Sequence, residues 1–138
     1  MRNVLITLFA VVLLSSCDND LKIISRDFSV SLKAIDSSTA TVGRAMKCTF
    51  SVNGLDPDNS DELFTTFFVK DGSGQILIDN DEYKPGETIV YDYKETGKMI
   101  FDFVPATAGE QSLILSVSSE IVTRSDTVVI NVSSKPAV

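Results

Sequence analysis

The chain has 138 residues with 12 basic and 19 acidic side chains, so its formal net charge at pH 7 is −7. A protein with this negative balance repels phosphate groups, which makes nucleic acid an unfavourable partner and argues against membrane binding through a basic patch. Histidine is absent. Its absence removes the usual general base, the commonest metal ligand and any Ser-His-Asp or Cys-His catalytic arrangement.

The N-terminal segment has the pattern of an export signal. Arg2 gives the first residues a positive charge, and Val4 to Leu14 is apolar except for Thr7. This run of about 11 residues suits a signal-peptide core and is well short of the roughly 20 needed to span a bilayer. Ser15 and Ser16 are small, as a signal peptidase requires. We therefore predict that residues 1–16 are a signal peptide.

Cys17 follows this signal directly. Leu14-Ser15-Ser16-Cys17 resembles the lipobox of bacterial lipoproteins. The resemblance implies that the thiol of Cys17 carries a diacylglycerol and that its amine is acylated after cleavage, with no other cofactor. Two or three acyl chains give a stable membrane anchor, since each buried methylene contributes about 0.8 kcal/mol. An ordinary secretory signal with a chance cysteine is the alternative.

The predicted location is the bacterial cell envelope. Asp18 resembles an inner-membrane retention signal of enteric bacteria. Acidic residues behind the cysteine, here Asp18 and Asp20, also resemble a signal for export to the outer surface in Bacteroides-type bacteria. We expect the outer membrane, on its periplasmic or surface face, rather than the inner membrane.

Short segments with apolar residues at every second position follow along the chain, as expected for β-strands with one buried face. In chain order, the residues predicted to share such a face are Phe28, Val30, Leu32 and Ala34; Met46, Cys48, Phe50 and Val52; Ile89, Tyr91 and Tyr93; Met99, Phe101 and Phe103; Leu113, Leu115 and Val117; and Val128, Ile130 and Val132.

The segment 62–70 is apolar on both faces, which predicts a central strand. Asp71-Gly72 and Gly74 then predict a tight turn with positive φ angles, followed by a returning strand at 75–79. Breaks are predicted at Pro85-Gly86 and from Pro105 to Gly109. No segment behind Cys17 has a sustained helical period.

Eight or so short strands separated by turn signals predict an all-β fold, an antiparallel β-sandwich. The stretch VPATAGEQSLILSV, Val104 to Val117, resembles the place in immunoglobulin-like bacterial domains where the chain crosses between sheets. The chain lacks tryptophan, and Cys48 has no partner cysteine if Cys17 is lipidated. We therefore predict a single immunoglobulin-like or fibronectin-like sandwich without a disulfide over 27–133, with a small open barrel as the alternative. Residues 17–26 would be the lipidated N-terminus and tether, and 134–138 a tail.

An acidic loop is the weak candidate for a metal site. Its oxygen-bearing residues, Asp56, Asp58, Ser60, Asp61 and Glu62, faintly resemble a calcium loop. The glycine and the distant bidentate glutamate of an EF-hand are missing, so we expect solvated turns and no metal. We interpret Asp79 to Glu82 in the same way.

Two further groups of side chains could carry function. Cys48 could be a nucleophile, but its place on an apolar face and the lack of a base favour a core thiol. Tyr83, Tyr91 and Tyr93 could form a binding platform, although Tyr91 and Tyr93 share an apolar face and core packing is favoured. Paired carboxylates could cleave glycosides, but no aromatic-lined cleft is visible. We predict that the protein is not an enzyme, and its binding residues are unknown.

Three stretches resemble the TraQ-like conjugal transfer lipoproteins of Bacteroides-type conjugative transposons. They are Cys17 to Leu21 behind the lipobox, the aromatic strand, Asp-Gly turn and apolar strand from Phe67 to Ile78, and the tyrosine-bearing segment from Tyr91 to Tyr93. The resemblance implies a non-catalytic envelope component of a conjugation apparatus, which acts through contacts with other envelope proteins. It carries over no catalytic residue.

A lipid-anchored surface module that binds a glycan or a host protein is the alternative function. An exposed aromatic patch opposite the core would favour that alternative.

Overall fold

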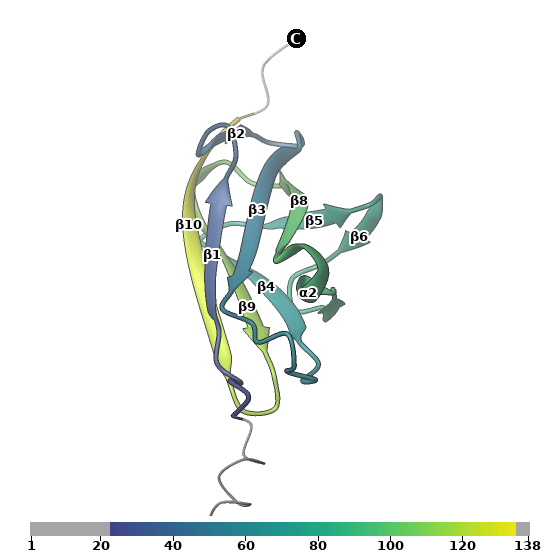
Figure 1. Cartoon of the computed structure of the whole chain (residues 1–138). Coiled ribbons are helices and arrows are strands. Elements are labelled where there is room, and N and C mark those ends of the chain that lie inside the picture. The colour runs from purple at the N-terminus through teal and green to yellow at the C-terminus, as the bar shows by residue number, and fades with distance from the viewer. Residues whose placement is uncertain (1–22, 135–138) are drawn as a thin grey trace, which may run out of the picture.

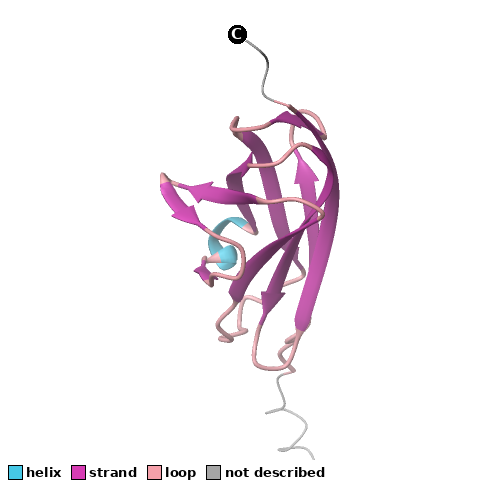
Figure 2. Cartoon of the chain, turned by 180° about the vertical axis from the view of Figure 1, so that it is seen from behind, coloured by secondary structure: helices cyan, strands magenta, loops and turns pink. Residues whose placement is uncertain are grey.

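Two five-stranded sheets packed face to face make up the part of the chain that the structure, a computed structural model, describes, residues 23–134 (Figures 1 and 2). The first sheet has the strand order β1 (Ser29–Ala34), β3 (Met46–Asn53), β8 (Lys98–Pro105), β5 (Gly74–Ile78) and β6 (Asp81–Tyr83). The second has the order β2 (Thr39–Thr41), β10 (Thr123–Ser133), β9 (Gly109–Ser118), β4 (Phe64–Lys70) and β7 (Ile89–Val90). A short helix, α2 (Tyr93–Thr96), follows β7.

This order confirms the predicted immunoglobulin-like sandwich. The neighbours β1-β3-β8-β5 and β10-β9-β4 reproduce the A-B-E-D and G-F-C orders of that fold. The small open barrel is ruled out, because the strands form two separate sheets. One pair departs from the antiparallel expectation: β2 runs parallel to the end of β10.

The core lies between the sheets and includes most residues of the predicted alternating faces. Met46, Cys48, Phe50 and Val52 of β3 are all buried, and so are the predicted residues of β8 and β9. Full burial of a side chain such as Phe50 or Leu115 stabilises a fold by roughly 1.5–3 kcal/mol. The period of two in the sequence therefore identified the inner faces correctly.

The chain changes sheets where the sequence predicted it. β8 belongs to the first sheet and β9 to the second, and residues 105–109 carry the chain between them. At one edge the sandwich is closed by side chains: Asp126 of β10 accepts a hydrogen bond from the backbone N–H of Leu32 at 2.7 Å, and Arg124 binds Asp27 at 2.8 Å. The first bond joins β1 to β10 across the two layers, and the second joins the segment just before β1 to β10.

The predicted hairpin at Asp71 to Gly74 is wrong. β4 and β5 lie in different sheets, so residues 71–73 form a crossing rather than a tight turn. Asp71 adopts the positive φ angle, 62°, whereas Gly72 and Gly74 do not. The glycines are needed for space: a Cβ on Gly74 would lie 2.6 Å from the Phe103 ring, and one on Gly72 would lie 2.5 Å from the Gln111 side chain.

β4 is also less central than predicted. β7 pairs with it only at Phe64 and Thr65, and its outer face is open to solvent, with Phe64 41% and Phe68 52% exposed. The predicted strand through Tyr91 and Tyr93 ends at Val90, where the chain turns into α2. The helix is local in origin, because the Asp92 side chain caps the N–H of Lys94 and Gly97 takes the left-handed conformation at the C-terminus.

The second acidic segment is a hairpin turn. Asp79 and Asn80 both have positive φ angles, and Ile78 pairs with Asp81 on either side of them. This is the geometry of a two-residue type I′ hairpin, in which Asp and Asn are favoured. The acidic residues here join β5 to β6.

Candidate functional site

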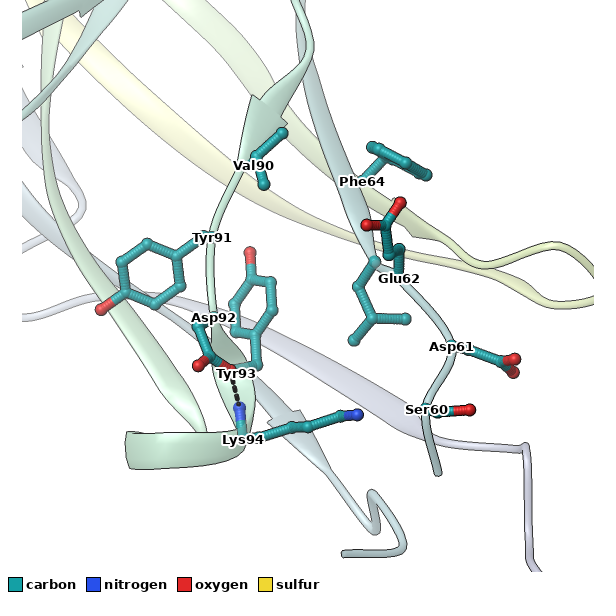
Figure 3. A pocket seen from close by; sticks show the side chains of 10 residues that line it. Ser60, Asp61, Glu62, Phe64, Val90, Tyr91, Asp92, Tyr93 and Lys94 are labelled. Atoms are coloured by element: carbon teal, nitrogen blue, oxygen red, sulfur yellow. Dashed lines mark hydrogen bonds between the residues drawn. The ribbon is translucent and has the colours of Figure 1, made fainter. Parts of the chain in front are cut away.

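Two segments that the sequence analysis selected separately meet beside the second sheet. Residues 60–64, from the acidic loop into β4, and residues 90–94, from β7 into α2, line a pocket of about 420 Å³ (Figure 3). The pocket begins where the β4–β7 pairing stops: Phe64 pairs with Val90, and the two segments then separate. Sequence spacing alone did not reveal this meeting, because it depends on a two-residue strand.

Tyr93 lies at the base of this pocket and is 1% exposed. Its hydroxyl lies 2.7 Å from Thr65 Oγ1 and donates to Met99 Sδ at 3.8 Å. Burial raises the pKa of Tyr93 to about 12, although the Thr65 bond opposes the shift. Tyr93 is thus a core residue whose hydroxyl is hydrogen-bonded, in agreement with the core packing that the sequence favoured.

The other two tyrosines do not join Tyr93 in an exposed platform. Tyr91 packs against the core in part, with its ring 5.1 Å from that of Tyr93 at 60°, and Figure 3 shows it pointing away from residues 60–64. Tyr83 lies on β6 and is also partly buried. Of the predicted tyrosines, only Tyr91 and Tyr93 are brought together.

The acidic loop is held by local bonds and by the N-terminal segment. Asp61 takes two bonds from Arg26, each 2.8 Å, and Arg26 thereby holds the pKa of this carboxyl below its ordinary value. Asp56 accepts from the N–H groups of Ser25 and Asp58. The loop therefore packs against residues 25 and 26.

That the acidic loop binds no metal remains a prediction. Among residues 23–134, no three Cys, Asp or Glu side chains lie together in an arrangement that could hold a metal ion. Asp61 points away from the pocket in Figure 3. Glu62 is the next residue of the pocket wall, and it makes no ion pair with any residue that the structure describes.

The pocket has polar groups at its rim and apolar groups beneath. Leu63 and Tyr93 are buried, while Phe64 and Val90 are exposed at 41% and 77%. Lys94 reaches across the pocket, and its ammonium donates to the backbone oxygen of Asn59. The arrangement suits an apolar side chain of a ligand, flanked by a charged group.

Cys48 is a buried free thiol in the core. Burial, reinforced by the negative charge of Asp102, raises its pKa to about 12. A thiol that stays protonated and inaccessible is a poor nucleophile, which agrees with the predicted structural role.

The predicted lipidation residue Cys17, the peptidase residues Leu14, Ser15 and Ser16, and tail residues 135–138 lie outside the described residues. Within 23–134, no helix has the length and apolar character needed to cross a membrane.

Neither a protein-family profile nor a curated protein matches the chain. Solved structures do match. A conjugative transposon lipoprotein from Bacteroides eggerthii superimposes with a TM-score of 0.61 at 17% identity, over 78% of this chain and 99% of that chain. A conjugate transposon protein from Bacteroides vulgatus gives a TM-score of 0.60 at 10% identity, over 81% and 91% of the two chains. A lipoprotein from Bacteroides thetaiotaomicron gives 0.59 at 14% identity, over 82% and 87%.

The chain is therefore similar in fold to three proteins of Bacteroides, of which two are described as lipoproteins and two as conjugative transposon proteins. The likeness expected from Cys17, the Asp-Gly segment and the tyrosine segment is confirmed at the level of the fold. At these identities it shows the shared architecture and leaves the activity of this chain to be tested.

Proposed function

We propose that this protein is a lipid-anchored, non-catalytic component of the bacterial cell envelope that acts through protein contacts in a conjugal transfer apparatus. The observation that carries the proposal is the shared sandwich: about four-fifths of the chain superimposes on conjugative transposon proteins of Bacteroides. The lipobox at Leu14 to Cys17 supports the anchor, and its acyl chains would hold the sandwich at the membrane.

Its non-catalytic character is supported by the chemistry of the described residues. The chain has no histidine, Cys48 is buried and protonated, and the Tyr93 hydroxyl is engaged in the core. The pocket at Phe64 and Val90 contains charged groups but no paired nucleophile and base among its lining residues.

The anchor is tested by growth with a clickable palmitate analogue and by membrane fractionation. Wild-type protein should be labelled and sediment with membranes, and Cys17→Ser should lose the label and its processing. Cys48→Ser is the matched control, since it removes the other cysteine and should keep the label. Labelling of Cys17→Ser at the wild-type level would refute the lipid anchor. Separation of the two membranes on a density gradient tests the outer-membrane expectation.

The role in transfer is tested in the host. Deletion of the gene should lower the conjugation frequency, wild-type protein should restore it, and Cys17→Ser should not. A deletion strain that transfers DNA at the wild-type frequency would refute the proposed role.

A surface module for glycan or host protein is the second candidate, because Phe64 and Phe68 are both exposed on the face of β4 opposite the core. The neighbouring genes distinguish the two: a transfer operon favours conjugation, and a polysaccharide-utilisation cluster favours the binding module.

A further inference from the structure

The outer surface of the second sheet differs from the rest of this acidic protein. We call it the neutral face: the outward side chains of β4 from Phe64 to Phe68, with the residues paired to them on β9 and β10. Of these described positions none is charged; they are Phe, Ile, Ser and Thr. In a chain with net charge −7, this uncharged patch with two exposed phenylalanines is a candidate interaction surface.

The opposite side of the sandwich shows the contrast. On the outer face of the first sheet, Lys47 of β3 forms an ion pair with Asp102 of β8 at 3.8 Å, and Lys33 and Lys98 also lie on that face. Charged residues keep an exposed sheet surface solvated and resist association. The second sheet lacks this protection between Phe64 and Phe68.

Four hydroxyl groups of the neutral face are already paired. Ser116 and Ser125 lie 2.6 Å apart across β9 and β10, and Ser118 and Thr123 lie 3.0 Å apart. Covering a hydroxyl that has a partner costs less than covering one that relies on water. A partner could therefore exclude water here without leaving these groups unsatisfied.

The size of the face selects the kind of partner. Three strands about 4.8 Å apart and five residues of about 3.4 Å rise give a surface on the order of 240 Å². A stable contact between folded proteins buries about 800 Å² on each side. The face is therefore small for a second copy of this chain and matches an extended segment of about five or six residues.

The pocket continues the face at its Phe64 end. Phe64 belongs to both, and Val90, which pairs with it on β7, lines the pocket, so a segment on the face could place one side chain between residues 60–64 and 90–94. Glu62 lies in this wall without an ion pair among the described residues. The nearby cations are engaged elsewhere: Arg26 by Asp61 and Glu120, and the Lys94 ammonium by the backbone oxygen of Asn59. A cationic partner group would satisfy Glu62, and a second acidic copy would be repelled there.

We infer that the neutral face and its pocket bind an extended segment of another envelope protein. The segment is apolar at alternate positions and carries Lys or Arg beside the residue that enters the pocket. This inference rests on the proposed function, since it gives the site of the protein contacts which that function requires.

Site-specific photo-crosslinking in cells tests the inference on the full chain. Phe68→p-benzoylphenylalanine places a photo-reactive ring on the neutral face. Ile100→p-benzoylphenylalanine is the matched control, because Ile100 is similarly exposed, 48% against 52%, but lies on the outer face of the first sheet. The expected result is an adduct from position 68 and none from position 100, with mass spectrometry placing the crosslink in an alternating apolar segment that contains Lys or Arg.

Charge reversal provides the second measurement. Glu62→Lys should lower the adduct yield from position 68 by about threefold, as expected for an exposed ion pair. Glu82→Lys, which makes the same change on β6 of the first sheet, should leave the yield unchanged.

Each other outcome overturns the inference. An adduct with a second copy of this chain would identify the face as a self-association surface, and equal adducts from both positions would remove its specificity. An adduct from position 100 alone would leave the protein-contact function standing and reject the neutral face. No adduct from either position would count against the face, and intact palmitate labelling would show that the anchor is unaffected.

Discussion

The hydroxyl pair of Tyr93 and Thr65 offers a prediction whose magnitude follows from the structure. The oxygens lie 2.7 Å apart, and the residues are 1% and 0% exposed. Tyr93→Phe leaves the Thr65 hydroxyl buried without this partner, which should lower the free energy of unfolding by about 1–3 kcal/mol. Thr65→Val should cost about as much, because the Tyr93 hydroxyl then retains only Met99 Sδ, at 3.8 Å.

The double variant Tyr93→Phe/Thr65→Val should lose less unfolding free energy than the sum of the two single losses. Removing both hydroxyls replaces a polar pair with groups of similar shape, which can be nearly neutral, so we expect a coupling energy of about 1–2 kcal/mol.

Urea unfolding followed by circular dichroism measures all four proteins of the cycle. Tyr83→Phe is the control, since Tyr83 is only partly buried, and it should change stability by less than about 0.5 kcal/mol. Additive losses from Tyr93→Phe and Thr65→Val, within about 0.5 kcal/mol, would refute the assignment of the pair as one buried unit.

Three further predictions concern the core and its crossings. Gly74→Ala should destabilise the fold by about 1–3 kcal/mol, because the added Cβ clashes with the Phe103 ring. Gly43 has open space around it but a φ of 77°, so Gly43→Ala should cost about 1–2 kcal/mol through backbone strain alone. An unchanged melting temperature for Gly74→Ala would contradict the close approach of Phe103. As the pH rises from 9.0 toward about 12, the unfolded chain loses the Cys48 proton that the native state keeps, so stability should fall by up to about 1.4 kcal/mol per pH unit from this thiol. Urea titrations of Cys48→Ala should show a shallower decline, and equal slopes would argue against a buried neutral thiol. Phe67→Ala should cost about 3–5 kcal/mol and Phe68→Ala less than about 0.5 kcal/mol in the same assay, and similar losses would mean that the faces of β4 are misassigned.

The inner faces of the strands were predictable because a period of two is a local property of the sequence. Met46 to Val52 and Met99 to Phe103 show it directly, and both segments bury the predicted side chains. The sheet change before β9 was also predictable, since proline and glycine interrupt the chain there.

The errors arose where distant residues decide the structure. The sequence around Gly72 and Gly74 is typical of a turn, but in the structure these glycines admit Gln111 and Phe103 from strands more than 25 residues away. The two apolar faces of β4 suggested burial on both sides, and nothing local indicated that Phe64 and Phe68 would remain uncovered.

The candidate site was predictable only in parts. The acidic loop and the tyrosine segment are each recognisable in the sequence, whereas their meeting depends on the two-residue pairing of β4 with β7. Glu62, Phe64 and Val90 were not recognised together, and the only sequence signal was the outward apolar residues of 62–70.

The closed seam between β1 and β10 has a mechanical consequence. Both strands run in the same direction, and the start of β1 and the end of β10 lie at opposite ends of the sandwich (Figure 1). A force that pulls the chain by its two termini would load the bonds between these segments in shear. They are the β2–β10 backbone pairing and the Leu32–Asp126 and Arg124–Asp27 bonds. Under shear these bonds must break together rather than one after another. We therefore expect a high rupture force in single-molecule pulling, and Asp126→Ala should lower it. Such a domain would resist being torn open by tension between its two ends.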